Sequence, residues 1–365
     1  MKRIENYRQE LHKRAELDMY LPKTTAYIKE QLEGLPCKII EIIPFSLCVY
    51  FDAGKQSSVA FRSDMDALPI EEDERHTIVS MQKGVMHACG HDGHMAMLLE
   101  LAQRIAKYYK NLTKNILLIF QPGEERCAGA KVLCEKQILR IFRVKAIFGI
   151  HLMPRIEKGK IAFKQGAMMA GSHEIFIDIK GKAVHIAQYK KGNDALECSA
   201  SFLVKMYEKL ETSGILCRIN YMKSGTACNV VSDTTHMEGS IRYFHKNALK
   251  NYLDEIKQVK IEMEKRYGTS IKIKLSDGYP PLCNNKKICQ NIFRLNYPLL
   301  YQLQEPHYTS EDFSYYLQEC PGVFFFLGLG ESAPLHSKAF HFDESVLERG
   351  VEFYEWILQS LDNIC

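Results

Sequence analysis

The chain has 365 residues, of which 46% are apolar and 25% are charged, and its formal net charge is +4. These values are typical of a soluble globular protein and exclude disordered, collagen-like and disulfide-rich classes, while the length predicts two domains. No segment approaches the ~18 consecutive apolar residues of a membrane helix, the N-terminus lacks the apolar core of a signal peptide, and the positive charge is too dispersed for a nucleic-acid-binding face. We therefore expect a cytoplasmic protein that binds neither membranes nor nucleic acid.

Strand-like and helix-like segments alternate over the first 165 residues. Apolar strands that alternate with helices predict an α/β domain with a mostly parallel sheet covered on both faces. The predicted helices start near Pro22 and span 95–110, and the predicted strands are 46–52, 58–64, 115–120 and 146–150.

The pattern changes between about 172 and 278. Strand, helix, two strands, helix and strand follow one another there, which is the order of the ferredoxin-like α+β unit. The α/β pattern resumes after Tyr279, with an apolar strand at 323–329 and a C-terminal helix at 345–361. The sequence thus predicts a catalytic domain of residues 1–170 and 279–365, into which a lid or dimerisation domain of residues 171–278 is inserted. Its edge strands are suited to pairing in a homodimer, although the sequence does not decide the oligomeric state.

Acidic, His and Cys side chains follow the predicted strands and precede the long helix. In open α/β sheets ligands bind beyond the carboxyl ends of the strands, so we expect these side chains to gather at one edge. They are Asp64 and Asp66, Glu124 and Glu125, His151, His336, and Cys89 with His91.

Imidazole, thiolate and carboxylate groups together form the ligand set of transition-metal sites. The candidates are too many for one tetrahedral ion, so two ions that share a ligand explain them more simply. Each candidate also has a structural interpretation. Asp64 would pair with Arg62, Cys89 would be a small buried residue, and the two consecutive glutamates would be a solvated face. The neighbouring His87 and His94 would orient ligands or be ordinary buried histidines, and Glu311-Asp312 would cap a helix.

Several motifs occur in an order that resembles a known family. They are FRSDMDALPIEE, MHACGHDGHMAML, FQPGEE, GIHLMP, SGTACNVVSD, EGSIR, SEDF and LHSKAF. This combination, spread over nearly the whole chain, is similar to the dinuclear-metal amidohydrolases of the aminoacylase and carboxypeptidase type. Within them it resembles the branch of hippurate hydrolase, indole-acetyl-amino-acid hydrolase and N-acetyldiaminopimelate deacetylase. The resemblance implies a catalytic α/β domain with an inserted lid domain.

The resemblance also implies a role for each candidate residue and a cofactor of two divalent ions, with Zn, Mn, Ni and Co as alternatives. Glu124 corresponds to the general base, and Asp66 to an Asp that orients a ligand. Asp64 stands where distant relatives have a metal-binding His, so it is either a ligand or an orienting residue. On the lid, His185, Asn229 and Arg242 correspond to residues that close over the substrate. There we expect His185 to stabilise the oxyanion and Arg242 to hold a substrate carboxylate. The implied metal ligands are Cys89, His91, Glu125, His151 and His336, with Cys89 as the bridge.

The function expected from these residues is hydrolysis of the amide bond of a small N-acyl amino acid by a metal-bound hydroxide, with Glu124 as general base. A carboxypeptidase or dipeptidase with the same metal centre is the nearest alternative. A cysteine hydrolase that uses Cys89 is disfavoured, because Cys89 and His91 at i and i+2 give no nucleophile–base contact. A non-catalytic binder of the same fold would be expected to lack a ligand or Glu124, and both are present.

Overall fold

The computed structural model describes residues 2–211 and 213–364 and divides the chain into two compact units. Unit 1 comprises Met1–Met168, Cys283–Glu305 and Asp312–Cys365, and unit 2 comprises Met169–Leu282 and Pro306–Glu311. The short segment 306–311 belongs to unit 2 because the backbone N–H of Ala170 donates to the carbonyls of His307 and Thr309. Among the described residues, no helix is both long and apolar enough to cross a bilayer.

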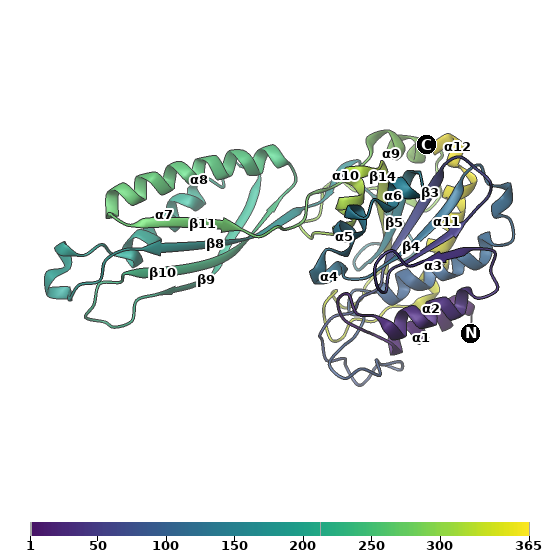
Figure 1. Ribbon diagram of the computed structural model, residues 1–365, viewed down its shortest axis with the longest axis horizontal. Coiled ribbons are helices and arrows are strands. Elements are labelled where there is room, and N and C mark those ends of the chain that lie inside the picture. Colours follow the sequence, from purple (N-terminus) through teal and green to yellow (C-terminus); the bar gives the residue numbers. More distant parts are fainter. Residues whose placement is uncertain (1, 212, 365) are drawn as a thin grey trace. The chain divides into compact units, whose positions relative to one another are not determined.

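Unit 1 is built on one mixed sheet with the strand order β1-β2-β4-β3-β5-β14-β6-β13 (Figure 1). Its centre is parallel, since β3 runs parallel to both β4 and β5, and β5 runs parallel to β14. The mostly parallel sheet predicted from the sequence is thereby confirmed. The strands are β1 (Lys38–Ile40), β2 (Leu47–Phe51), β3 (Ser58–Asp64), β4 (Asn115–Gln121), β5 (Val144–Met153), β6 (Ile161–Phe163), β13 (Leu300–Gln302) and β14 (Gly322–Gly328).

Helices cover both faces of this sheet. Helices α3 and α11 pack on one face and share a large apolar cluster with α1 and α2. On the opposite face, Phe313 packs on Phe324 and over Gly149, where a Cβ atom would lie 3.0 Å from its ring. The helices of unit 1 are α1 (Arg3–Lys13), α2 (Pro22–Leu32), α3 (His91–Ile105), α4 (Glu124–Cys127), α5 (Gly129–Glu135), α6 (Ile138–Ile141), α9 (Lys286–Arg294), α10 (Tyr316–Glu319), α11 (Leu347–Gln359) and α12 (Leu361–Ile364).

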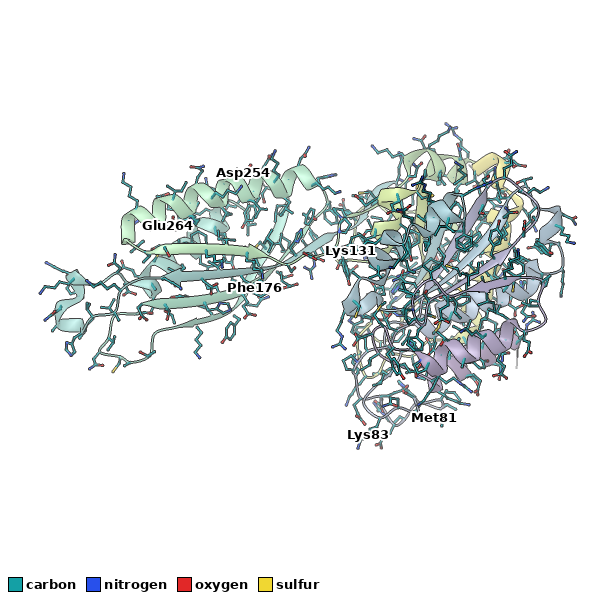
Figure 2. All side chains as sticks on the ribbon, in the orientation of Figure 1. Met81, Lys83, Lys131, Phe176, Asp254 and Glu264 are labelled. Atoms are coloured by element: carbon teal, nitrogen blue, oxygen red, sulfur yellow. The ribbon has the colours of Figure 1, made fainter. Side chains whose placement is uncertain are left out.

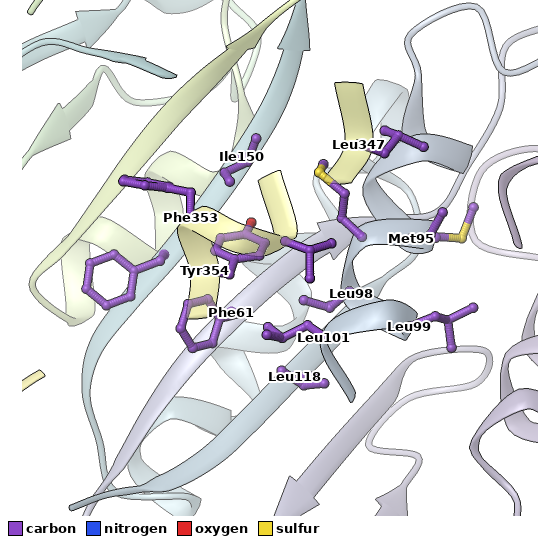
Figure 3. Packing of buried hydrophobic residues seen from close by; sticks show 14 of the residues in the cluster. Phe61, Met95, Leu98, Leu99, Leu101, Leu118, Ile150, Leu347, Phe353 and Tyr354 are labelled. Atoms are coloured by element: carbon purple, nitrogen blue, oxygen red, sulfur yellow. The ribbon is translucent and has the colours of Figure 1, made fainter. Parts of the chain in front are cut away.

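The core of unit 1 lies between α3, α11 and the central strands (Figure 3). Every residue of β3 and β4 is buried, and β4 appears in the sequence as a continuous apolar run because both of its faces are covered. The ring of Phe61 on β3 contacts those of Phe148 and Tyr354, with ring centroids 5.7 and 4.9 Å apart. Burial of these large side chains fixes the sheet whose polar end carries the candidate site.

Unit 2 is a four-stranded antiparallel sheet with the order β11-β8-β10-β9. Helices α7 and α8 pack on one face of it, where Ile177, Met237 and Ile271 meet Phe202 and Tyr252 (Figure 1). This is the ferredoxin-like arrangement expected from the sequence. The elements of unit 2 are β8 (Gly171–Lys180), α7 (Ala195–Glu208), β9 (Ile215–Ser224), β10 (Thr234–Tyr243), α8 (Lys246–Tyr267) and β11 (Ser270–Leu275), and the short strands β7 (Gly166–Met169) and β12 (Leu282–Asn284) pair where the chain passes between the units.

The largest difference from the sequence-based expectation is α1, which was not predicted. Its segment is strongly polar, yet Arg8 and His12 are each only 1% exposed. Two other boundaries also shift. Helix α3 begins at His91, before the predicted start at 95, and β5 continues beyond 150 to include His151. Both extensions place candidate ligands on regular elements rather than in loops.

Replacing Phe61 with Ala is expected to lower the free energy of unfolding of unit 1 by about 3–5 kcal/mol, because a fully buried aromatic side chain is removed from a close-packed core. Urea titration followed by the fluorescence of Trp356 measures this, since the only Trp of the chain lies in α11 of unit 1. Ile141→Ala, at a side chain that is 58% exposed in α6, is the matched control. Equal effects of the two substitutions would contradict the assignment of Phe61 to the core.

Candidate metal centre

The parallel strands bring the polar residues to one edge of the sheet of unit 1. In the strand register, Asp64 at the end of β3 pairs with Gln121 at the end of β4, and His151 on β5 pairs with Phe326 on β14. Because Arg62 pairs with Gly149, Asp64 and His151 lie at the same level of the sheet. The carboxyl ends of these strands therefore meet where the sequence placed the candidate ligands.

A sharp turn before α3 delivers Cys89 and His91 to this edge. Gly90 has φ +85°, a left-handed conformation that favours glycine. A Cβ atom there would also lie 3.1 Å from Leu152 Cδ1. The turn leaves Cys89 just outside the helix and makes His91 its first residue.

Cys89 lies at the centre of the predicted ligands. Its Sγ is 3.4 Å from His151 Nε2 and 3.3 Å from His336 Nε2. Ligands 2.0–2.3 Å from a tetrahedral zinc ion are roughly 3.5 Å apart, so the spacing suits neighbours on one ion. The ligand atoms of Cys89, His91 and His151 form one compact group, and those of Cys89, Glu125 and His336 form a second. Cys89 belongs to both groups, as a bridging ligand between two ions would.

The imidazoles of His91 and His151 are arranged as neutral ligands. The Nδ1 atoms of His91 and His151 each lie 2.7 Å from a backbone carbonyl, that of Asp66 and that of Leu152, to which Nδ1–H donates. This leaves Nε2 as the lone-pair nitrogen, and His91 Nε2 is buried with no hydrogen-bond partner among the described residues. Burial lowers the pKa of His91 to about 4 and that of His151 well below its usual value. Neutral imidazole is the form that binds a metal, so these residues fit a metal pair.

His336 reaches the site from a strained loop after β14. It is a non-glycine residue with φ +61°, a conformation that costs energy and occurs often at functional sites. Its backbone N–H donates to the carbonyl of Ala88, which holds the ring beside Cys89. The side chain remains about half exposed, so this ligand position is on the open side of the site.

Asp66 holds the two consecutive glutamates. Its carboxylate oxygens accept the backbone N–H groups of Glu124 and Glu125 at 2.8 and 3.1 Å, at the start of α4. Burial raises the pKa of Asp66 to about 7, although these two donors favour its charged form. Oxygens of Glu124 and Glu125 lie together with a nitrogen of His91 in one group of candidate ligands. Glu124 is therefore adjacent to the ligands, where a general base would be needed.

Asp64 is engaged by side chains of unit 1. Its Oδ1 accepts from His94 Nδ1 at 2.7 Å and its Oδ2 from Arg62 Nη1 at 2.8 Å. Burial alone would raise the pKa of Asp64, but His91, His94 and Arg62 hold it well below its usual value. Its Oδ2 lies 3.7 Å from His91 Nε2, and Asp64, His91 and His94 form a further group of candidate ligands. Both roles left open by the sequence, ligand and orienting residue, therefore fit this geometry, and the pairing with Arg62 is present as well.

His94 and Asp312 have positions that the sequence left undecided. The backbone N–H of Leu152 donates to His94 Nε2 at 2.9 Å, so His94 connects Asp64 to the strand that carries His151. Asp312 accepts from Arg62, from Gln121 and from the backbone N–H of Ala130 in the first turn of α5. It therefore caps the start of that helix and fixes Arg62. In the sequence, only the HDGH and SEDF motifs indicated that His94 and Asp312 have a role near the site.

A buried charged cluster lies behind α3, and nothing in the sequence predicted it. His12 Nδ1 lies 2.7 Å from Asp92 and its Nε2 2.8 Å from Glu72, while Arg8 also pairs with Asp92 at 2.8 Å. Burial opposes charge on His12, but Asp92 and Glu72 outweigh it and raise the pKa of His12. Because Asp92 follows His91 directly, this cluster ties α1 to the first turn of α3.

Unit 2 carries the three predicted lid residues at two places. His185 and Asn229 are exposed and lie together, since His185 pairs with Val230 in an isolated bridge and Ile186 N–H donates to Asn229 O. This pair lies beyond the Thr234 end of β10, where Val231 N–H also donates to Val184 O. Arg242 lies near the other end, paired with Ser172. At 3.4 Å per residue, Thr234 and Arg242 are about 27 Å apart along the strand, so the three do not form one cluster within unit 2.

Residues 60–360 match the model of peptidase family M20/M25/M40. The chain belongs to this family. It is 30% identical over 97% of both chains to the N-acetyldiaminopimelate deacetylase of Leuconostoc mesenteroides, and 30% identical to that of Leuconostoc citreum over 95% of this chain and 93% of the other. A Bacillus subtilis structure described as a dinuclear metal binding peptidase from the M20 family superposes with a TM-score of 0.88 at 29% identity, over 99% of this chain and 98% of that one.

Family membership settles the class of protein. This M20 protein is a metal-dependent hydrolase that acts on amide bonds. The resemblance stated from the motifs is confirmed, and so is the α/β fold with a separate smaller unit. The individual site residues and the substrate remain predictions, which the geometry described above allows us to make specific.

Replacing His94 with Ala is expected to weaken metal binding about 10–100-fold, because residues that orient ligands have effects of this size. Competition with a chromophoric chelator measures the affinity, and the visible spectrum of the Co²⁺ form reports ligand geometry. His94→Gln, whose amide still donates to Asp64, should lose less. Unchanged affinity and an unchanged Co²⁺ spectrum in His94→Ala would contradict a positioning role.

Replacing His12 with Gln tests the buried cluster through its pH dependence. Since the folded-state pKa of His12 is raised, its stabilisation is complete below about pH 6.5 and is lost as the pH rises through the folded-state value. The difference in free energy of unfolding between wild type and His12→Gln should therefore shrink with rising pH, as followed by Trp356 fluorescence. The exposed His245 of unit 2 gives the control, His245→Gln. A difference that does not change with pH would rule out a charged His12.

Proposed function

We propose that this M20 protein removes the acyl group from small N-acyl amino acids by hydrolysis of the amide bond. The observation that carries the proposal is the pair of ligand groups that share Cys89, with Glu124 adjacent to them. Two deacetylase relatives of the same length class support an N-acyl amino acid as substrate. Cys89, His91, Glu125, His151 and His336 would hold the ions.

Two divalent ions bound by these residues would polarise the amide carbonyl and lower the pKa of a water molecule. Glu124 would take the proton of the attacking water and later donate it to the leaving amine nitrogen. Its backbone N–H is anchored on Asp66, so the carboxylate starts from a fixed position. A general base of this kind contributes about 10²–10⁴-fold to the rate.

Unit 2 is proposed to contribute substrate contacts as a lid. His185 would stabilise the oxyanion of the tetrahedral intermediate, Arg242 would bind the substrate carboxylate by a two-pronged hydrogen bond, and Asn229 would contact the substrate beside His185. Since about 27 Å of strand separates Arg242 from the other two, one copy of unit 2 does not bring all three to one small molecule. A homodimer through the edge strand β9, whose Leu216 and Tyr221 are exposed, would allow two copies to share these roles.

Glu124→Gln is expected to lower turnover of an N-acetyl amino acid by about 10²–10⁴-fold while the bound metal stays unchanged, because the amide cannot accept the proton. Turnover is measured by amine release, and metal content by elemental analysis of the same preparation. Glu135→Gln, at an exposed glutamate of α5, is the matched control. Near-normal turnover of Glu124→Gln would contradict its role as general base.

The same assay separates the alternatives. A chelator should abolish activity and Mn²⁺ or Zn²⁺ should restore it, whereas a cysteine hydrolase would survive the chelator. Turnover of N-acetyl, N-benzoyl and dipeptide substrates, compared side by side, distinguishes a deacylase from a dipeptidase. The dipeptidase alternative is tested because a similar structure is described as a peptidase. Absence of turnover with every substrate, in protein that binds two ions, would favour a non-catalytic binder.

A further inference from the structure

Unit 2 has a pocket of about 590 Å³ that none of the predicted site residues lines. It lies on the sheet face opposite α7 and α8. Successive strand residues point to opposite faces, and Ile177 and Ile179 of β8 face the helices, so Phe176, Asp178 and Lys180 face the other way. Figure 2 labels Phe176 on the strands, and Asp254 and Glu264 on α8 across the sheet.

The strand register explains why charged side chains gather in this pocket. One row across the four strands is Lys272, Asp178, His236 and Lys223, because each pairs with the next. The adjacent row is Ser270, Lys180 and Thr234. All of these line the pocket, and the loop after β9 closes one end of it with Gly225 and Thr226. Three lysines from three different strands therefore surround one cavity.

Two carboxylates near the lysines, Asp178 and Glu238, pair with His236 and not with the lysines. His236 Nδ1 lies 2.7 Å from Asp178, and its Nε2 lies 2.8 Å from Glu238. These two carboxylates raise the pKa of His236 and hold it as their partner. Among the residues that the structure describes, Asp178 is the only carboxylate that lines the pocket. Within the described chain, Lys180, Lys223 and Lys272 form no ion pair within 4 Å.

We propose that this lysine pocket of unit 2 binds a small anion with two or more negative charges, such as a phosphate group or a dicarboxylate. Three ammonium groups around one cavity repel one another unless an anion neutralises them, and Lys binds phosphate as a compact point charge. The hydroxyl of Ser270 supplies a neutral donor at the same wall. The volume suits a small molecule. The pocket is lined by residues of unit 2, whereas the five predicted metal ligands belong to unit 1.

Isothermal titration of the full-length, metal-loaded protein at low ionic strength tests the proposal. Inorganic phosphate, sulfate, succinate and acetate are the probes, and phosphate or sulfate binding better than succinate would identify a tetrahedral anion rather than a dicarboxylate. We expect at least one dianion to bind more tightly than acetate, and its affinity to fall as added salt screens the lysines.

The variant Lys180→Ala/Lys272→Ala should weaken dianion binding about tenfold or more, because hydrogen bonds to charged groups are lost. Lys250→Ala, at an exposed lysine of α8 on the other side of the sheet, should stay within twofold of wild type. Circular dichroism and N-acyl amino acid turnover show that the fold and the metal centre persist. Equal binding by the double variant and wild type, equal binding of acetate and the dianions, or no binding at all would each overturn the proposal.

Discussion

The carboxylate of Asp66 is the interaction on which the rest of the candidate site depends. It accepts the first two backbone N–H groups of the Glu124-Glu125 turn, while the carbonyl of the same residue accepts Nδ1–H of His91. One residue, two positions after the end of β3, thus fixes the expected general base, one expected ligand carboxylate and one expected ligand imidazole. The turn it holds is tight, because Gly123 has φ +72° and a Cβ atom there would lie 2.3 Å from Met19 Sδ. The sheet places these residues at one edge, and the hydrogen bonds to Asp66 orient the Glu124-Glu125 turn and the His91 ring.

Burial of charged side chains at this edge would be costly unless each charge were paired. The pairs that form determine which nitrogen, oxygen and sulfur atoms stay available to bind a metal. Arg62 neutralises Asp64 and Asp312, and His94 uses one nitrogen on Asp64 and the other on a backbone amide. The imidazoles of His91 and His151 are held neutral by burial and donate their Nδ1 protons to carbonyls. These contacts leave the Nε2 atoms of His91 and His151 without a proton, and both atoms lie within 4.8 Å of the Cys89 sulfur. We therefore expect these outer contacts to orient the predicted ligands.

The sequence predicted the elements that obey a local rule and missed those that depend on long-range pairing. The apolar runs of β3, β4 and β14 stood out because both faces of these strands are buried. Helix α1 was missed because Arg8 and His12 occupy its buried face, and their partners Asp92 and Glu72 lie 60 or more residues away. The role of His94 stayed open for the same reason. The separation of Arg242 from His185 and Asn229 follows only from strand register, which no motif encodes.

Register also links the two proposed activities of unit 2 to one geometric property of its sheet. The eight steps along β10 between Thr234 and Arg242 span about 27 Å, yet cross-strand neighbours lie only about 5 Å apart. Side chains that bind the same small molecule therefore have to lie in the same row or in adjacent rows, as the three lysines do. Side chains at opposite ends of the strand must contact different molecules, or belong to different copies of the chain when they contact the same one. The apolar packing that stabilises unit 2 lies on the sheet face covered by α7 and α8. The polar residues of the opposite face can therefore differ without disturbing that packing. Substitutions on the face that is not packed against helices can therefore alter which ligand the sheet binds while the fold is retained.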